Sequence, residues 1–174
     1  KCRYGLMLNE DGMVYDDGVT TRLDENHYIM TTTTGGAANV MGKLEDYLQT
    51  EWPELEVYLT SVTDHFATVS ICGPNSKKIL NKVISDLDLS DENFPHMSFK
   101  NAQIGKIKCR VMRISFTGEH SYEINVQGNY GKSVWEKCME AGKEFNITPY
   151  GTEAMHLLRA EKGFIIVGQD TDGT

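Results

Sequence analysis

The alternation of short strand-like runs with amphipathic helical stretches is the strongest constraint on the fold of this chain. Apolar residues recur at helical spacing after Gly36, after Gly73-Pro74 and after Gly131, and the opposite face of each stretch is polar. Strand-like runs bounded by Gly, Asp and Asn lie between these stretches. Such helices bury one face against a sheet. We therefore expect an α+β fold with mixed or antiparallel sheets covered on one face by helices.

Turn and termination signals divide the chain into expected elements. Asp11-Gly12 is a reversal signal, because Gly accepts positive φ without steric cost. Trp52-Pro53 ends the helix that begins near Gly36, since proline disfavours helix at the preceding residue. Gly163 is a typical residue after a helix C-terminus. The expected strands are 3–8, 20–23, 27–32, 57–60, 67–72, 107–114 and 122–126, and the expected later helices begin at 73 and span 131–141 and 152–161. Residues 86–95 read as a surface connection.

Charge and cysteine usage exclude several classes of protein. The net charge is −8 and there is no basic run, which argues against a nucleic-acid partner. No apolar run reaches the length of a membrane span, so no membrane partner is expected. The four cysteines form no CxxC pair, the histidines are scattered without metal spacing, and no metal is expected. A reducing, cytoplasmic compartment is favoured. The first residue is not Met, and we expect an excised fragment of a longer polypeptide.

Two carboxylates, Asp16 and Asp17, stand before Gly18 and are the first candidates for chemistry. Neighbouring residues of a strand point to opposite faces, so only one of the two can enter a given pocket. One interpretation is a solvated turn. The other is a single acid beside a cationic or amine centre, where a fixed charge lowers a barrier.

Phe116, Glu123 and Arg159 are further candidates. A Thr-Gly turn could place Phe116 and Glu123 on adjoining strands that face one cavity, where a flat heteroaromatic ring would stack and bond its edge to a carboxylate. A hairpin with a solvated Glu is the alternative. Arg159 lies among apolar residues of the last helix, where it either extends to solvent or pairs with an anion. No GxGxxG motif occurs, so no flavin or nicotinamide fold is indicated.

Further runs of the sequence stand beside these candidates. In chain order they are Arg3-Tyr4, Leu8-Asn9-Glu10-Asp11-Gly12, Asp16-Asp17, Gly73-Pro74, Phe116-Thr117-Gly118-Glu119, Tyr122-Glu123, Leu158-Arg159-Ala160-Glu161-Lys162-Gly163 and Val167-Gly168-Gln169-Asp170. Taken in this order, they resemble the glycine cleavage T protein superfamily of folate-dependent aminomethyltransferases. A second set consists of Thr32-Thr33-Thr34-Gly35-Gly36-Ala37-Ala38, Gln49-Thr50-Glu51-Trp52-Pro53-Glu54-Leu55, Ser61-Val62-Thr63-Asp64-His65 and residues 168–173. This set is similar to the folate domain at the C-terminal end of sarcosine oxidase α subunits.

The resemblance implies part of a three-lobed folate-binding fold with ferredoxin-like lobes. Residues 1–54 would be the remainder of the first lobe and 55–150 the second lobe. Residues 151–174 would be a helix and strand returning to the first lobe. By position, the resemblance makes Asp17 the catalytic acid, which orients the folate amine nitrogens and stabilises a cationic methylene iminium. The implied folate-binding residues are Tyr4, Thr33, Phe116, Glu123 and Arg159.

The same resemblance implies a reaction and its partners. A flavin elsewhere in the complex would oxidise sarcosine, and this domain would convert the sarcosine-derived imine and tetrahydrofolate to glycine and 5,10-methylenetetrahydrofolate. Flavin and NAD are expected only in other parts of the enzyme, with other sarcosine oxidase subunits as partners. Phe116 replaces the tyrosine usual in transferases, which favours this branch. The alternatives are a glycine cleavage T protein, a dimethylglycine dehydrogenase domain, a non-enzymatic folate-binding module and a purely structural lobe.

Overall fold

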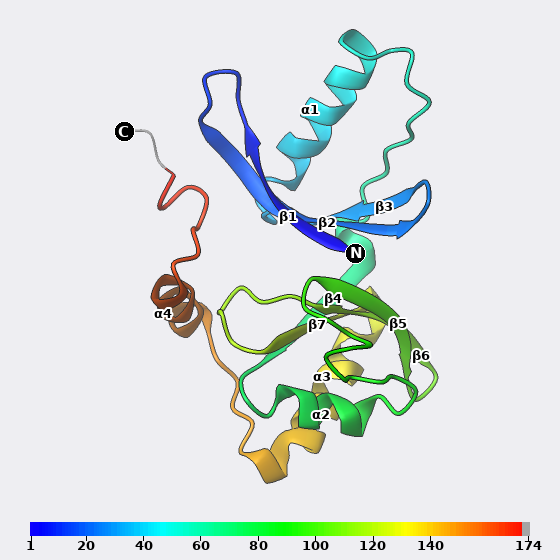
Figure 1. Ribbon diagram of the computed structural model, residues 1–174, viewed down its shortest axis with the longest axis vertical. Coiled ribbons are helices and arrows are strands. Elements are labelled where there is room, and N and C mark those ends of the chain that lie inside the picture. Colours follow the sequence, from blue (N-terminus) through cyan, green and yellow to red (C-terminus); the bar gives the residue numbers. More distant parts are fainter. Residues whose placement is uncertain (172–174) are drawn as a thin grey trace. The chain divides into compact units, whose positions relative to one another are not determined.

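The computed structural model describes residues 1–171, which contain two antiparallel sheets (Figure 1). The chain forms two compact units. The first unit is Cys2–Thr63 together with the described residues from Ile166 onward, and the second is Asp64–Ile165. The expected division at 54 and 150 into functional lobes stays a prediction. Residues 172–174, and with them the end of the 168–173 run, lie outside the described residues.

The first unit contains a three-stranded sheet and one long helix. The strands are β1 (Cys2–Leu8), β2 (Val14–Asp24) and β3 (His27–Met30), in the order β1-β2-β3, and the helix is α1 (Ala37–Thr50). β2 is longer than expected because β1 provides partners along its length: Met7, Leu6 and Gly5 pair with Asp16, Asp17 and Gly18. The interpretation of Asp16 and Asp17 as a solvated turn is therefore wrong.

A β-bulge separates the two carboxylates from the turn that joins β1 to β2. Met7 pairs with Asp16, whereas Leu8 pairs with Val14, so Tyr15 is an extra residue on β2. The turn itself is closed by two hydrogen bonds between backbone groups of residues 9–13 and places Gly12 at φ +82°. On the other side of the bulge the regular pairing continues, with Asp16 and Asp17 on opposite faces of the sheet.

The second unit contains a four-stranded antiparallel sheet in the order β4-β7-β6-β5. Both described sheets are antiparallel, so the mixed alternative does not apply. A ferredoxin-like lobe has the order βαββαβ, but this unit has the order βαβββαα, and that expectation is corrected. The short connection from β6 to β7 makes β7 return antiparallel, with no crossover helix. The elements are β4 (Phe66–Cys72), α2 (Ser76–Val83), β5 (Ser98–Ile104), β6 (Ile107–Arg113), β7 (Ser121–Gln127), α3 (Gly131–Gly142) and α4 (Thr152–Lys162), with short 3-10 helices at Thr63–His65, Gly128–Tyr130 and Lys143–Phe145.

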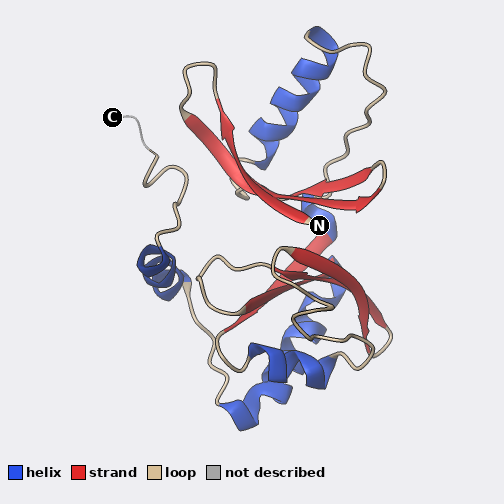
Figure 2. Ribbon diagram, in the orientation of Figure 1, coloured by secondary structure: helices blue, strands red, loops and turns tan. Residues whose placement is uncertain are grey.

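Helices α2 and α3 cover one face of this sheet and enclose the main core (Figure 2). Alternate residues of β7 enter the core, as the period of a strand requires. Trp135 lies among the apolar residues after Gly131 but is 44% exposed, whereas Phe94, in the expected surface connection, is fully buried. The core includes Val69, Ile71, Ile79, Leu80, Ile84, Leu89, Phe94, Val111, Tyr122, Ile124, Val126, Val134 and Cys138.

Helix α4 ends as its sequence predicts. Gly163 has φ +82° and closes the helix by donating its backbone N–H to the carbonyl of Ala160. Within the described residues, none of the helices is both long enough and apolar enough to cross a membrane.

Candidate functional site

Asp17 lies on the face of the first sheet that also carries Tyr4 and Leu6. Leu6 is its partner on β1, and the hydroxyl of Tyr4 donates a hydrogen bond to Asp17 Oδ2 at 2.8 Å. Partial burial, followed by the hydrogen bond and the charge of Asp17, raises the pKa of Tyr4 to about 12. Tyr4 therefore remains a hydrogen-bond donor at neutral pH. Tyr4 and Asp17, two of the predicted site residues, are thus in direct contact.

Asp16 points to the opposite face and is almost completely buried. Its Oδ1 accepts hydrogen bonds from the backbone N–H of Asp17 at 2.8 Å and of Thr33 at 3.0 Å. Its Oδ2 accepts one from the hydroxyl of Thr33 at 3.0 Å. Thr33, a predicted folate-binding residue, thus contacts Asp16 rather than Asp17. Asp16 fastens the segment before α1 to β2, which is a structural role.

Replacing Asp16 by Asn is expected to lower the free energy of unfolding by about 1–3 kcal/mol. An amide keeps one acceptor oxygen where the carboxylate has two, so a donor from Asp17 or Thr33 is left without its bond. Urea unfolding followed by circular dichroism measures the change. Asp17→Asn is the matched control, since Asp17 accepts a single hydrogen bond from an exposed tyrosine. Equal midpoints for Asp16→Asn and the wild type would contradict this assignment.

Glu123 lies on the face of the four-stranded sheet opposite α2 and α3, which we call the open face. Its cross-strand neighbours are Ser70 on β4 and Met112 on β6. Within residues 1–171, no donor or cation is bound to its carboxylate, and burial raises its pKa. A carboxylate in this state is available to accept hydrogen bonds from a ligand.

Tyr150 is a neighbour of Glu123 that the sequence did not indicate. Burial, then hydrogen bonding and charge interaction with Cys72, and finally the charge of Glu123 raise the pKa of Tyr150 to about 12. Tyr150 follows a short extended stretch with no recognisable motif. Its position beside the open face arises from the path of residues 145–150 after α3, which no local pattern encodes.

Phe116 lies in the connection between β6 and β7 and not on a strand, so the expected placement of Phe116 and Glu123 on adjoining strands is wrong. Arg159 lies in α4. The turn at Gly118 has φ +80°, and a Cβ there would lie 2.5 Å from the Lys162 side chain, so the connection packs against α4. Arg159 donates from Nη1 to the carbonyl oxygen of Phe164 at 3.0 Å. Arg159 thereby holds the segment after its own helix.

The six predicted residues are divided between the two units. Tyr4, Asp17 and Thr33 belong to the first unit, and Phe116, Glu123 and Arg159 to the second. Their assembly into one site stays a prediction. Among residues 1–171, no three His, Cys, Asp or Glu side chains gather as a metal site would require, and all four cysteines are free thiols.

Comparison with known sequences gives one family and several relatives. The family described as "GCVT N-terminal domain" matches residues 1–174. Sarcosine oxidase subunit alpha of Corynebacterium sp. (strain P-1) is 58% identical over 173 residues, which are 99% of this chain and 18% of that protein. The corresponding subunit of Rhizobium meliloti (strain 1021) is 48% identical and covers 95% of this chain and 17% of that protein. Aminomethyltransferase of Thermoanaerobacter sp. (strain X514) is 33% identical, with 96% and 44% covered.

A solved structure has the same fold. The glycine cleavage system aminomethyltransferase T from Bartonella henselae matches with a TM-score of 0.80 at 23% identity, covering 98% of this chain and 43% of that chain. The chain therefore spans 18% of the Corynebacterium protein's length and under half of the transferase.

Proposed function

Because the chain belongs to the GCVT N-terminal domain family, we propose that it forms part of a tetrahydrofolate site of the sarcosine oxidase α-subunit type. When bound, tetrahydrofolate supplies the amine nitrogens that capture the one-carbon unit of a sarcosine-derived imine. Glycine and 5,10-methylenetetrahydrofolate are then released. The identity of 58% to a sarcosine oxidase α subunit, compared with 33% to an aminomethyltransferase, favours this branch.

The observation that carries the proposal is the contrast between Asp16 and Asp17. Asp16 is fully engaged by backbone and hydroxyl donors, whereas Asp17 has one hydrogen bond, from Tyr4, on a face that also carries Leu6. A carboxylate fixed in position by a hydrogen bond stabilises a cationic centre that develops beside it. Asp17 is thus placed to orient and stabilise an amine-derived cation, and Tyr4 to orient Asp17.

The open face contributes the second part of the proposal. A reduced pterin presents several N–H donors along one edge, and the Glu123 carboxylate has its acceptor capacity unused within residues 1–171. Glu123 would bind that edge of the pterin, and Phe116 would stack on its ring. Arg159 and Thr33 would shape the pocket indirectly, by fixing the segment after α4 and the segment before α1. The donor and acceptor chemistry of these residues fits a folate.

Other features of the proposal concern parts beyond this chain. The amine-oxidising flavin, the NAD and the other sarcosine oxidase subunits belong to the complete enzyme, for which a reducing, cytoplasmic compartment is proposed. A glycine cleavage T protein or dimethylglycine dehydrogenase domain would use the same site on other amines. A non-enzymatic folate-binding module remains the alternative outside catalysis. Product formation from sarcosine, compared with dimethylglycine and an aminomethylated carrier protein, distinguishes them.

Replacing Glu123 by Gln is expected to weaken tetrahydrofolate binding by about 10- to 100-fold. The amide replaces an acceptor oxygen with a donor, which cannot bond the pterin N–H groups. Calorimetric titration of tetrahydrofolate into the complete polypeptide that carries this sequence measures the effect and tests the proposed function. Saturable binding by the wild type that is lost or weakened in the variant supports a folate site, and no binding by the wild type contradicts it.

The same variant should be more stable without ligand. Burial raises the folded-state pKa of Glu123 above its ordinary value, so this group favours folding below its unfolded pKa. The contribution is lost as the pH rises through the folded pKa. At pH 7 the neutral amide avoids the cost of a buried charge, and the thermal midpoint should rise. A lower midpoint would show that Glu123 has a structural partner instead.

A further inference from the structure

Four polar side chains form a row across the open face. Thr68 on β4 pairs with Asn125 on β7, Asn125 pairs with Arg110 on β6, and Arg110 pairs with Asn101 on β5. Cross-strand partners lie on the same face of a sheet, so the row runs perpendicular to the strands. None of its members belongs to the proposed catalytic or pterin-binding residues.

The central pair of this row has unused hydrogen-bond donors. The hydroxyl of Thr68 donates to Asn125 Oδ1 at 2.8 Å and so fixes the orientation of the amide. The amide nitrogen of Asn125 and Nε of Arg110 are both buried, and within residues 1–171 neither has an acceptor. A buried donor without a partner costs free energy. The two residues are cross-strand partners, so both donors can be directed at one acceptor on this face.

The guanidinium of Arg110 lies beside the ring of Phe99, whose centroid is 6.0 Å from Cζ. Phe99 is the neighbour of Met112 on β5, in the row that contains Glu123. This contact with the ring leaves the planar N–H groups of the guanidinium available to bind a planar anion. Burial lowers the pKa of Arg110 from its ordinary value, which reflects the desolvation that a bound anion would offset.

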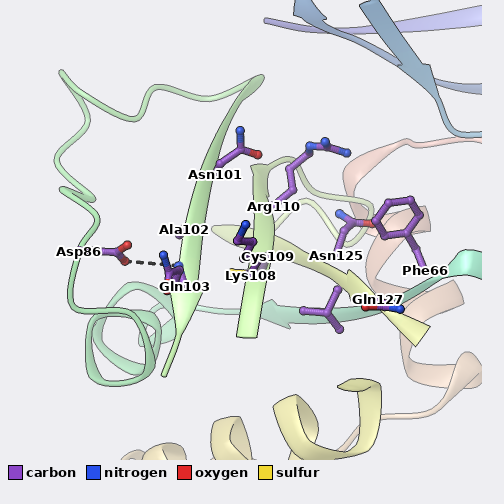
Figure 3. Close-up of a pocket in the computed structure, with 11 residues that line it drawn as sticks. Phe66, Asp86, Asn101, Ala102, Gln103, Lys108, Cys109, Arg110, Asn125 and Gln127 are labelled. Carbon is purple, nitrogen blue, oxygen red and sulfur yellow. Dashed lines mark hydrogen bonds between the residues drawn. The ribbon is translucent and has the colours of Figure 1, made fainter. Parts of the chain in front are cut away.

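Arg110 and Asn125 line a pocket of about 440 Å³ on this sheet (Figure 3). Lys108 adds a second cation to its wall, and Gln127 adds another amide. Asp86 is the acid in the lining, and its Oδ1 accepts a hydrogen bond of 3.5 Å from the backbone N–H of Gln103, which is drawn in Figure 3. The lining is thus rich in donors and carries a net positive charge, which suits an anionic group of a small molecule.

We propose that Arg110 and Asn125 form a carboxylate-binding subsite on the open face. Nε–H of Arg110 and the amide N–H of Asn125 would donate to the oxygens of one carboxylate, with Lys108 nearby for charge. Asn125 is two residues from Glu123 on β7, a separation of about 7 Å along one face of a strand. This inference rests on the proposed function. One elongated ligand can reach both groups, and its carboxylate is either the glutamyl tail of the folate or the carboxylate of the amino acid.

Two substitutions in the complete polypeptide test the subsite. Arg110→Met removes the donors but keeps an unbranched side chain. Asn125→Asp keeps the acceptor for Thr68 and replaces the amide donor with an oxygen that pairs with Arg110, so it repels an anion without opening the sheet. Lys106→Met is the matched control: Lys106 is an exposed residue of the same unit and does not line the pocket.

Calorimetry with tetrahydrofolate and with tetrahydropteroate, which lacks the glutamyl tail, identifies the source of the carboxylate. Both variants are expected to weaken tetrahydrofolate binding by about 10- to 100-fold while tetrahydropteroate binding is unchanged. If both pterins bind normally but the dissociation constant for glycine rises by a similar factor, the carboxylate is that of the amino acid. The control should leave all three constants unchanged.

Unchanged constants for all three probes, with a lower thermal midpoint for Arg110→Met, would overturn the subsite and give Arg110 a structural role. This result would leave the proposed function intact, because wild-type tetrahydrofolate binding is measured in the same series. A wild type that binds neither pterin would overturn the proposed function. In that case the glycine titration alone would decide the subsite.

Discussion

Replacing Asp17 by Asn in the complete polypeptide is expected to lower the rate of tetrahydrofolate-dependent methylene transfer by about 100- to 1,000-fold. The amide has the shape of the carboxylate, and its oxygen still accepts the hydrogen bond that Tyr4 donates at 2.8 Å. The negative charge is lost. If Asp17 stabilises a cationic centre, that loss removes an interaction that strengthens as charge develops in the transition state.

The measurement is the formation of 5,10-methylenetetrahydrofolate with sarcosine as substrate, followed beside the oxidation of the amine. Amine oxidation should be unchanged, because the flavin is expected outside this chain. Tyr4→Phe is the companion variant. It keeps the charge of Asp17 and removes the hydroxyl that orients it, so a reduction of about 10-fold or less is expected. Equal folate-dependent turnover in Asp17→Asn and the wild type would exclude Asp17 as the catalytic acid.

Replacing Gly18 by Ala should destabilise the chain by about 3 kcal/mol, which is at the upper end of the range for overpacking. A Cβ at Gly18 would lie 1.7 Å from the carbonyl oxygen of Thr31 and 2.7 Å from its carbonyl carbon. These are backbone atoms that cannot rotate away. The backbone N–H of Thr31 also donates to the carbonyl of Val19 at 3.0 Å, so relieving the clash requires that local contact to open. The segment leading to Thr33 and α1 would be displaced.

Gly5→Ala is a matched control for this experiment, because Gly5 is the cross-strand partner of Gly18. A Cβ at Gly5 would meet no atom within 4 Å. Its substitution should change the free energy of unfolding by about 1 kcal/mol or less, in the stabilising direction if the backbone accepts alanine without strain. Urea unfolding of both variants measures the difference. Similar midpoints for the two would contradict the close approach of Gly18 to Thr31.

Local patterns were sufficient to predict most of the elements. The helices after Gly36 and Gly131 and the helix that ends at Gly163 are present as α1, α3 and α4, because each combines a helical period with a start or stop signal. The strands expected at 20–23 and 27–32 are present in β2 and β3, which pair as a hairpin. The α+β class follows from these elements alone.

Features set by distant partners could not be predicted. β5 was missed because Ser98–Ile104 is polar, and its strand exists through pairing with β6. Residues 57–60 are of types that are frequent in strands, but no strand forms there in the described part of the chain. Phe94 is buried by contacts such as that with Tyr122, at a centroid distance of 5.8 Å, although its own neighbours are polar. Tertiary context decides such cases.

The site was only partly predictable for the same reason. The alternation of a strand showed that Asp16 and Asp17 face opposite ways, but not which of them is occupied. The hydrogen bonds that Thr33 donates to Asp16 decide this, because they leave Asp17 as the carboxylate available to a ligand. Likewise, Arg110 and Asn125 carry no motif and become a pair only through the register of β6 and β7.

The bulge at Tyr15 affects how this protein can change over evolutionary time. Inserting or deleting a residue within a regular hairpin slips its register, and every side chain then changes face. Here the bulge separates the ladder that fixes Asp17 from the turn at residues 9–13. Lineages can therefore lengthen, shorten or decorate that turn while the carboxylate keeps its orientation. The same turn is a suitable insertion point for an epitope or a reporter peptide.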